Sequence, residues 1–362
     1  MTHQEGVFMS SAMSPTSDVA VIGAGLSGAL VARQLAQQNL SVTVIEAGDV
    51  ADGATGNSAE LALLGTPEFY ATLEERHGTA FATEVWELSA RNLELLAATA
   101  QSLGLPAPCV GSLRPIGTST EAPLAQRSAQ RLAHQGFNVT LEDAMELGYL
   151  IGLHTFDDLR FDPADMSRRL LAHRHITLRP RTEILRLDTD DEGVTLWGRR
   201  YSLRAKAAVL TAGAFAGRLC PTLRPYLTML PVQTLECRTP GQLALPLVLE
   251  EGQVLVQDRG DFWRLSAWTD QPQGDPWPLL EKYGQQFCPQ ATLRRRYTTW
   301  VGRSADGLPL VGQLAETPHL YTLTGLGPWG LSWAFVATQL LLGLMLHDED
   351  PGLFDVHRFD KM

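Results

Sequence analysis

The stretch DVAVIGAGLSGALVARQLAQQNLSVTVIEAG, residues 18–48, decides the fold of this chain. It opens with the β-branched run VAVIG, continues with apolar residues at helical spacing, and ends in a second apolar run, SVTVIE. Short apolar runs on either side of a helical pattern are typical of buried parallel strands joined by a crossover helix. The stretch therefore predicts a strand–helix–strand unit at the start of a Rossmann-like α/β domain.

Three glycines in a G-x-G-x-x-G pattern join the first strand to the helix. Gly23 permits a tight turn, Gly25 lets the backbone approach a pyrophosphate, and Gly28 lets helix and strand pack closely. Leu26 and Ser27 begin the helix, whose free N–H groups and positive dipole end attract phosphate. The unit therefore predicts a dinucleotide site.

Glu46 and Ala47 follow the second strand and complete that site. Glu46 comes 18 residues after Gly28, where its carboxylate can accept hydrogen bonds from both ribose hydroxyls and would repel a 2′-phosphate. The chain then enters GDVADGATGNSAELALLG, residues 48–65, a loop rich in small residues instead of another strand–helix repeat. Because such a loop can contact a second phosphate, the sequence favours FAD over a nicotinamide dinucleotide.

The bulk composition narrows the class of protein. The chain has 362 residues, 44% of them hydrophobic and 19% charged, which suits a globular protein of two domains. A net charge of -11 disfavours non-specific nucleic-acid binding. The four cysteines are scattered, so we expect no metal site. Residues 1–17 lack the basic and apolar parts of a signal peptide, so we expect a disordered tail and a cytoplasmic location.

Beyond the first unit, four further blocks occur in order along the chain: GATGN (53–57), LRFDPADMSRRLLAHRHITLRPRTEILRLDTD (159–190), AAVLTAGAFAGRL (207–219), and GRSADGLPLVG (302–312) followed by LYTLTGLGPWGLSWAFVATQLLLGLM (320–345). With these blocks the chain resembles the D-amino-acid oxidase superfamily of FAD-dependent oxidoreductases, which includes glycine oxidase, monomeric sarcosine oxidase and the D-amino-acid dehydrogenases. The resemblance runs from Asp18 to about Leu346, with Thr55 where the family usually has serine.

The resemblance implies cofactor contacts outside the first unit. Ile184 stands where the family places a backbone contact to adenine. The full set that it implies is Thr55, Asn57, Ile184, Thr211, Ala212, Gly213, Asp306, Gly325, Gly327, Trp329, Gly330 and Leu331. Sarcosine oxidases hold their flavin through a cysteine just before the D-G segment. Here that place has no cysteine, and Cys288 lies 18 residues before Asp306, so we predict a non-covalent FAD.

The fold that follows is a Rossmann-like, glutathione-reductase-type FAD-binding domain plus an α+β substrate domain. The FAD-binding domain would be discontinuous, built from 18–65, 155–218 and 300–362, with 66–154 and 219–299 forming the substrate domain. Residues 68–104 predict one or two amphipathic helices. The runs LPVQTLECR, LPLVLEEGQVLVQ and FWRLSAWTD predict a mostly antiparallel sheet with one polar face.

The implied chemistry is oxidation of a C–N bond in an amino acid or amine to an imine, by hydride transfer to flavin N5. A substrate carboxylate favours an arginine fork. Arg303, close to Asp306, is the first candidate and Arg264 the second, although either could be an ordinary ion-paired arginine. Trp329 is the tryptophan expected at the pocket wall, and Tyr226 and Tyr297 are weaker candidates.

Several alternatives stay open at this level. The electron acceptor could be oxygen, as in an oxidase, or a quinone or carrier, as in a dehydrogenase. The motifs also resemble the flavin domain that oxidises carboxymethylaminomethyl groups on wobble uridine of tRNA, which the acidic composition disfavours. A non-catalytic flavoprotein is a further possibility, and the oligomeric state is open.

The C-terminal stretch TGLGPWGLSW, residues 324–333, precedes an apolar run that ends at Leu346. The run spans 16 residues and contains polar residues, whereas a bilayer span needs about 20 apolar residues. We therefore expect no membrane span. A helix that starts near Gly330, with its free N–H groups towards a reduced flavin, is the preferred interpretation.

Overall fold

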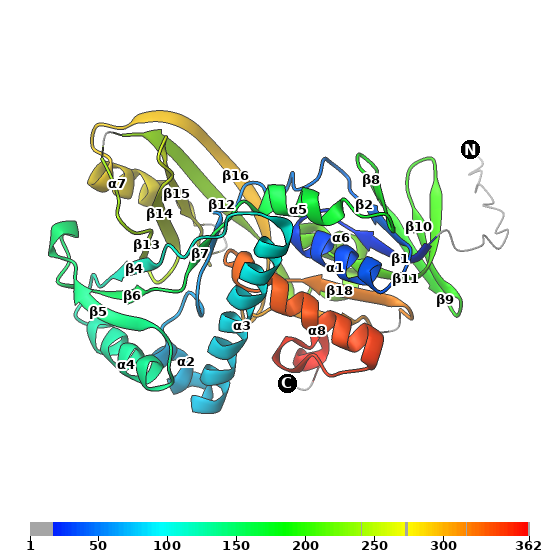
Figure 1. Cartoon of the computed structure of the whole chain (residues 1–362), viewed down its shortest axis with the longest axis horizontal. Coiled ribbons are helices and arrows are strands. Elements are labelled where there is room, and N and C mark those ends of the chain that lie inside the picture. The colour runs from blue at the N-terminus through cyan, green and yellow to red at the C-terminus, as the bar shows by residue number, and fades with distance from the viewer. Residues whose placement is uncertain (1–16, 240, 272–273, 316, 361–362) are drawn as a thin grey trace, which may run out of the picture.

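The computed structural model describes residues 17–239, 241–271, 274–315 and 317–360. The tail expected over residues 1–17 lies outside this part of the chain except for Ser17, which begins the first strand. Two eight-stranded sheets organise the molecule, one towards each end of the view in Figure 1. The mixed α/β architecture confirms the fold class expected from the sequence.

The first sheet is built around the strand–helix–strand unit of residues 18–48. β1 (Ser17–Ile22) pairs in parallel with β2 (Val42–Ile45), and α1 (Leu26–Gln37) connects them. The remaining strands are β8 (Ile176–Arg179), β9 (Arg186–Asp190), β10 (Gly193–Trp197), β11 (Ser202–Leu210), β17 (Leu310–Gln313) and β18 (Leu320–Thr324). The order of strands in the sheet is β17-β18-β11-β1-β2-β8, with β10 paired to β11 and β9 paired to β10. The five strands from β18 to β8 are parallel, as a Rossmann-like sheet requires.

The second sheet is mostly antiparallel, as expected. Its order is β16-β12-β15-β14-β13-β4-β6-β5, and among its named pairings the β13–β4 pair is parallel. The strands are β4 (Ser112–Pro115), β5 (Val139–Asp143), β6 (Ile151–Thr155), β12 (Leu227–Arg238), β13 (Leu247–Leu249), β14 (Val254–Asp258), β15 (Trp263–Ala267) and β16 (Thr292–Ser304). The expected domain boundary at 299/300 falls inside β16, and the division into domains stays a prediction.

The expectation of one polar sheet face does not hold for β13, β14 and β15. Nearly all their residues are buried, including Ser266 and Gln257. One reason is that α7 (Trp277–Phe287) packs against β15, with Leu280 and Tyr283 in the same apolar cluster as Leu265. Leu255 and Ser266 also line a cavity, described below.

Helices fill the space around the two sheets. The segment expected to form one or two amphipathic helices contains α2 (Tyr70–His77) and α3 (Thr79–Leu103). The other helices and short elements are α4 (Glu121–His134), α5 (Pro163–Leu171), α6 (Ala216–Leu219), α8 (Ala334–His347), the strand pair β3 (Leu61–Ala62) and β7 (Leu159–Arg160), and the 3₁₀ turns Met145–Leu147, Gly213–Phe215, Pro221–Leu223, Gly330–Ser332, Gly352–Phe354 and Val356–Phe359. α1 packs on α5 and α8 (Figure 1).

The C-terminal helix starts later than expected. A 3₁₀ turn occupies Gly330–Ser332, and α8 begins at Ala334. The cause is Asn92 of α3, whose Oδ1 accepts hydrogen bonds from the N–H groups of Phe335 and Val336 at 2.9 and 3.2 Å. Two of the amides expected to face a flavin are therefore capped from outside the helix.

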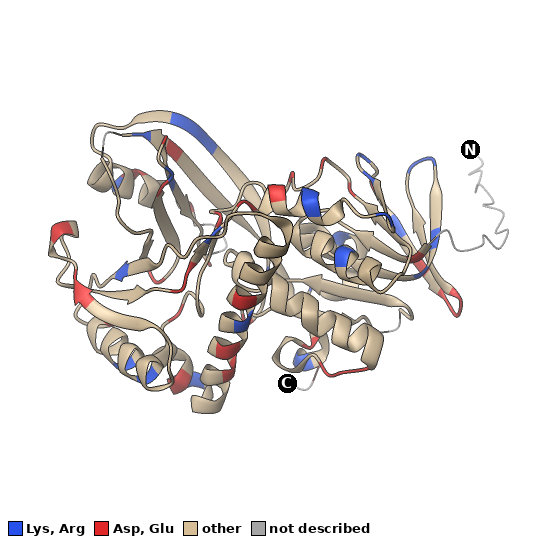
Figure 2. Ribbon diagram, viewed as in Figure 1, with Lys and Arg blue, Asp and Glu red and all other residues tan. Residues whose placement is uncertain are grey.

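The apolar C-terminal run is a core helix. α8 carries no Lys, Arg, Asp or Glu, whereas α3 carries charged residues in its middle turns (Figure 2). Phe335, Ala337 and Leu341 of α8 are buried. Within the described residues, no helix has the length and apolarity that a membrane crossing requires.

Candidate functional site

A cavity of about 560 Å³ is lined by residues from both sheets. That volume is within the range of about 300–1,000 Å³ seen for small-molecule and cofactor sites. Its lining runs from the turn after β1 and the N-terminus of α1, past the loop of residues 51–59, to β12, β14, β15, β16 and the loop of residues 325–331. The cavity therefore extends from the N-terminus of α1 to the second sheet, which is the length that a long dinucleotide would need.

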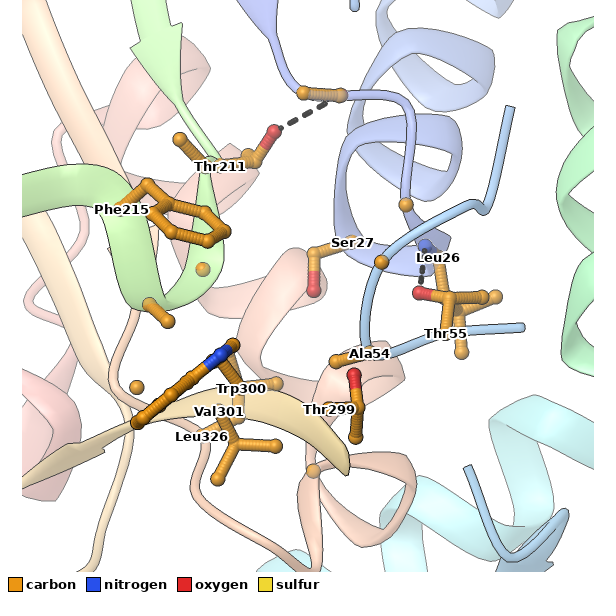
Figure 3. A pocket seen from close by; sticks show the side chains of 18 of the residues that line it. Leu26, Ser27, Ala54, Thr55, Thr211, Phe215, Thr299, Trp300, Val301 and Leu326 are labelled. Atoms are coloured by element: carbon orange, nitrogen blue, oxygen red, sulfur yellow. Dashed lines mark hydrogen bonds between the residues drawn. The ribbon is translucent and has the colours of Figure 1, made fainter. Parts of the chain in front are cut away.

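The N-terminus of α1 opens into this cavity as a positive helix end. Its N-cap residue, Gly25, supplies no side-chain cap, and the first turn contains no acid. The Leu26 N–H donates to Thr55 Oγ1 at 3.0 Å, which ties the loop of residues 51–59 to the helix start (Figure 3). Such an end favours a phosphate.

Two glycines leave room for a close backbone approach at this point. Gly23 has φ +112°, and a Cβ there would lie 2.6 Å from the Thr211 carbonyl oxygen. A Cβ on Gly25 would lie 2.9 Å from Thr55 Oγ1. Thr211 in turn donates its hydroxyl to the carbonyl oxygens of Ile22 and Gly23, at 3.0 and 3.2 Å (Figure 3). The turn is thus held in a shape that side chains would obstruct.

Glu46 is fixed at the cavity wall by backbone donors. Its Oε2 accepts from the Ala24 N–H and its Oε1 from the Gly48 N–H, both at 2.8 Å. Each carboxylate oxygen can accept a further hydrogen bond, as two ribose hydroxyls would require. Ile184 lines the same cavity.

Most of the residues expected to contact a cofactor line the cavity. They are Gly23, Gly25, Leu26, Ser27, Glu46, Ala47, Thr55, Asn57, Ile184, Thr211, Ala212, Gly213, Gly325, Gly327, Trp329, Gly330 and Leu331. The glycines of the turn after β1, the positive N-terminus of α1 and the carboxylate of Glu46 together fit the pyrophosphate and ribose of FAD.

Two of the expected cofactor residues are absent from the lining. Gly28 lies beneath it, where a Cβ would be 1.9 Å from the Gly23 carbonyl oxygen. Asp306 instead binds Arg358, which donates to it from Nε and Nη2 at 2.8 and 2.7 Å, and accepts from the Leu308 N–H. Both residues shape the backbone next to the site.

The second sheet supplies lining residues that sequence reasoning missed. They are Val232, Leu255, Ser266, Thr299 and Val301, with Phe215 from the turn after β11. Trp268 and Trp300 line the cavity as well, whereas Trp263 and Trp333 do not. Figure 3 shows Phe215, Thr299 and Trp300 around one cavity with Ser27. Strand alternation along FWRLSAW could have placed Ser266 on the same face as Arg264.

Neither candidate arginine lines the cavity with a free guanidinium. Arg264 is buried and pairs with Glu236 Oε1 at 2.9 Å and Glu60 Oε1 at 2.8 Å. Arg303 pairs with Asp270 at 2.5 Å. Tyr226 and Tyr297 also lie outside the lining. Each arginine therefore has a carboxylate partner within the protein.

Trp329 lies between this cavity and a smaller one and lines both of them. Its indole Nε1 donates to the Gly252 carbonyl oxygen at 3.1 Å, and its ring is 6% exposed. The smaller cavity, of about 30 Å³, has Arg114 and Asp158 among its lining residues. Asp158 Oδ1 accepts from the Leu64 N–H at 2.7 Å.

The burial of the Asp158 carboxyl leads us to expect that the stability of the protein depends on pH. Burial raises the pKa of this carboxyl to about 7. The folded chain therefore holds a proton that the unfolded chain releases near pH 4, so the stabilisation from this group is complete below about pH 4 and is lost as the pH rises through about 7.

The Asp158→Asn variant, which cannot titrate, should show a smaller fall in the free energy of unfolding between about pH 5 and pH 8. Urea unfolding at the two pH values measures this difference. An equal fall in the free energy of unfolding between the two pH values in wild type and variant would contradict the role of Asp158.

The described residues contain no group of three or more His, Cys, Asp or Glu side chains placed to hold a metal ion.

Comparisons with known proteins agree with this geometry. No curated protein matches the chain. Among solved structures, glycine oxidase from Geobacillus kaustophilus is 20% identical, with a TM-score of 0.77 over 94% of this chain and 98% of that one. L-proline dehydrogenase from P. horikoshii is 14% identical, with a TM-score of 0.80 over 96% and 99%. L-amino acid deaminase from Proteus vulgaris, in a form with its specific insertion sequence deleted, is 17% identical, with a TM-score of 0.76 over 97% and 96%.

These structural likenesses, all below 25% identity, show the fold. The family model of the DAO group, described as FAD dependent oxidoreductase, matches residues 18–343. That match covers nearly the whole chain, including both sheets and every segment of the cavity lining. The chain belongs to the DAO family of FAD-dependent oxidoreductases.

Proposed function

We propose that this protein oxidises the C–N bond of an amino acid or amine to an imine, by hydride transfer to N5 of a non-covalently held FAD. The single observation that carries the proposal is one continuous cavity between the N-terminus of α1 and the buried face of β14 and β15. The relatives reported above, a glycine oxidase, a proline dehydrogenase and an amino acid deaminase, favour the same substrate class.

Each part of the cavity has a physical task in this proposal. Bound FAD supplies the hydride acceptor. The α1 N-terminus holds the pyrophosphate and Glu46 the ribose. At the other end, Leu255, Val301 and Trp329 exclude water from the reacting carbon, and Ser266 and Thr299 offer hydroxyls that orient the substrate nitrogen. Positioning in a dry site is the main contribution that such residues make.

Non-covalent binding is supported by the cysteines. Cys109, Cys220, Cys237 and Cys288 are free thiols, and none of them lines the cavity in the described part of the chain. We further propose oxygen as the electron acceptor, with a quinone or carrier as the alternative, and a cytoplasmic location.

The test is anaerobic mixing of the purified holoprotein with glycine, sarcosine, D-amino acids, L-proline and polyamines. We expect one of these classes to bleach the flavin absorbance, because hydride transfer leaves the flavin reduced. Fast return of the colour on admitting air supports the oxidase, and slow return supports the carrier-linked enzyme. A flavin that dithionite bleaches but no member of the panel does would refute the proposed reaction.

A further inference from the structure

The smaller cavity behind Trp329 is a polar chamber beside the site. Its lining combines apolar side chains with a few polar ones from β4, β6, the loop after β6 and the residues before α2: Thr66, Glu68, Ser112, Arg114, Thr155 and Asp158. A water molecule needs about 10–15 Å³ of cavity volume, so a cavity of about 30 Å³ holds roughly two waters or the head of one carboxylate.

Arg114 is an arginine without a carboxylate partner in this chamber. In the described part of the chain its guanidinium makes one hydrogen bond, from Nη2 to the Thr66 carbonyl oxygen, at a long 3.4 Å. The group otherwise stacks on rings, with Cζ 4.7 Å from the centroid of Phe69 and 5.9 Å from that of Trp329. A guanidinium carries five N–H donors, so most of the hydrogen-bonding capacity of Arg114 is unused.

The guanidinium of Arg114 forms no ion pair with a carboxylate among the described residues. Burial lowers its pKa to about 10, so the side chain stays cationic at neutral pH, and Glu121, Asp158 and Glu251 act on it only through space. Arg114 is partly buried, and a partly buried cation without a carboxylate partner can form charge-assisted hydrogen bonds with an anion. A cation kept in this state points to an anionic ligand.

The two arginines that the sequence nominated for a carboxylate do not offer the same opportunity. Arg264 already holds Glu60 and Glu236, and Arg303 holds Asp270. A substrate carboxylate would have to displace one of these partners, whereas at Arg114 it would fill unused donors. Arg114 is therefore the better-prepared carboxylate site.

Two acids line the chamber, and one oxygen of Glu68, the buried Oε2, has no hydrogen-bond partner among the described residues. Glu68 pairs with Arg76 at 3.0 Å. Asp158, whose pKa burial raises to about 7, is about half protonated near neutral pH. In its protonated form it can donate a hydrogen bond to a carboxylate instead of repelling it.

We propose that Arg114 binds a carboxylate of the substrate that lies several bonds from the oxidised C–N bond. This inference rests on the proposed function, since it places the C–N bond in the larger cavity. Trp329 lines both cavities, so the substrate has to pass beside its side chain. Its loop contains Gly325 and Gly327, with φ +73° and +70°. The substrate class is then an amino acid or amine with a remote carboxylate, such as an acidic amino acid.

Calorimetric titration of the holoprotein with glutarate tests the proposal without turnover. We expect Arg114→Met to weaken glutarate binding by at least about tenfold, the loss that a charged hydrogen-bonded pair commonly represents. Arg127→Met is the matched control, because Arg127 lies on the surface of α4, half exposed, and the substitution removes the same charge. It should leave glutarate binding unchanged.

Thermal unfolding of the same variants separates a binding role from a structural one. Arg114→Met should unfold at or above the wild-type temperature, since no carboxylate loses its partner. If Arg114→Met does not fold, Arg114→Lys serves instead; it keeps the charge, loses the planar fork and should weaken glutarate binding.

Three results overturn the proposal: no glutarate binding by wild type, equal affinity in the Arg114 variant whatever its unfolding temperature, or sulfate binding as tight as glutarate binding. Failure of every amine to bleach the flavin would overturn the proposed reaction and still leave this measurement readable.

Discussion

Replacing Gly28 with alanine is expected to abolish FAD binding and to lower the free energy of unfolding by about 3 kcal/mol, the upper range for an overpacked core. The new Cβ would lie 1.9 Å from the Gly23 carbonyl oxygen and 2.8 Å from Thr211 Oγ1. The first of these neighbours is backbone, so α1 would have to move away from β1. The phosphate-binding end of the helix would move with it. FAD content after purification and urea unfolding measure the two effects.

Gly284→Ala is the matched control for this substitution. Gly284 also lies in a helix, α7, and its Cβ would meet Leu235 at an ordinary 3.5 Å. Because glycine inside a helix is less favourable than alanine by roughly 0.5–1 kcal/mol, this variant should be as stable as wild type or slightly more stable. A Gly28→Ala protein that retains full FAD would show that the close helix–strand contact is not needed.

Replacing Arg264 with methionine is expected to lower the free energy of unfolding by about 3–5 kcal/mol, the usual result of removing one partner from a buried ion pair. The change leaves Glu236, whose side chain is 4% exposed, with only Arg294 at 3.8 Å. It also removes the 2.8 Å hydrogen bond from Arg264 Nη1 to the Ser58 carbonyl oxygen. Since Ser58 lines the cavity, FAD affinity should fall as well.

A double variant distinguishes lost pairing from lost packing. Adding Glu236→Gln to Arg264→Met removes the orphaned charge, so part of the stability should return. Urea unfolding of the two single variants and the double variant measures the coupling. An Arg264→Met protein within about 1 kcal/mol of wild type would argue against the buried pair as a stabilising contact.

Sequence patterns correctly predicted the elements whose structure depends on residues close together in the chain. The strand–helix–strand unit of residues 18–48 has the form expected, because glycine spacing and apolar periodicity act over a few residues. The antiparallel character of the second sheet also followed from short alternating runs.

Contacts between distant segments explain what could not be predicted. Glu60 and Arg264 are 204 residues apart, and Asp270 and Arg303 are 33 apart, so no spacing rule could show that both candidate arginines are already paired. The cap that Asn92 supplies to α8 is likewise made across 243 residues. Arg114 drew no attention in the sequence because its lack of a partner is visible only in three dimensions.

The measurement that tests the central claim most directly is the flavin content of the purified protein before and after denaturation. The protein should be yellow, and acid or heat denaturation should release FAD into the supernatant at about one molecule per chain, since no cysteine lines the cavity in the described residues. A colourless protein that does not take up added FAD, or flavin that stays with the precipitated chain, would contradict a non-covalent FAD site in this cavity.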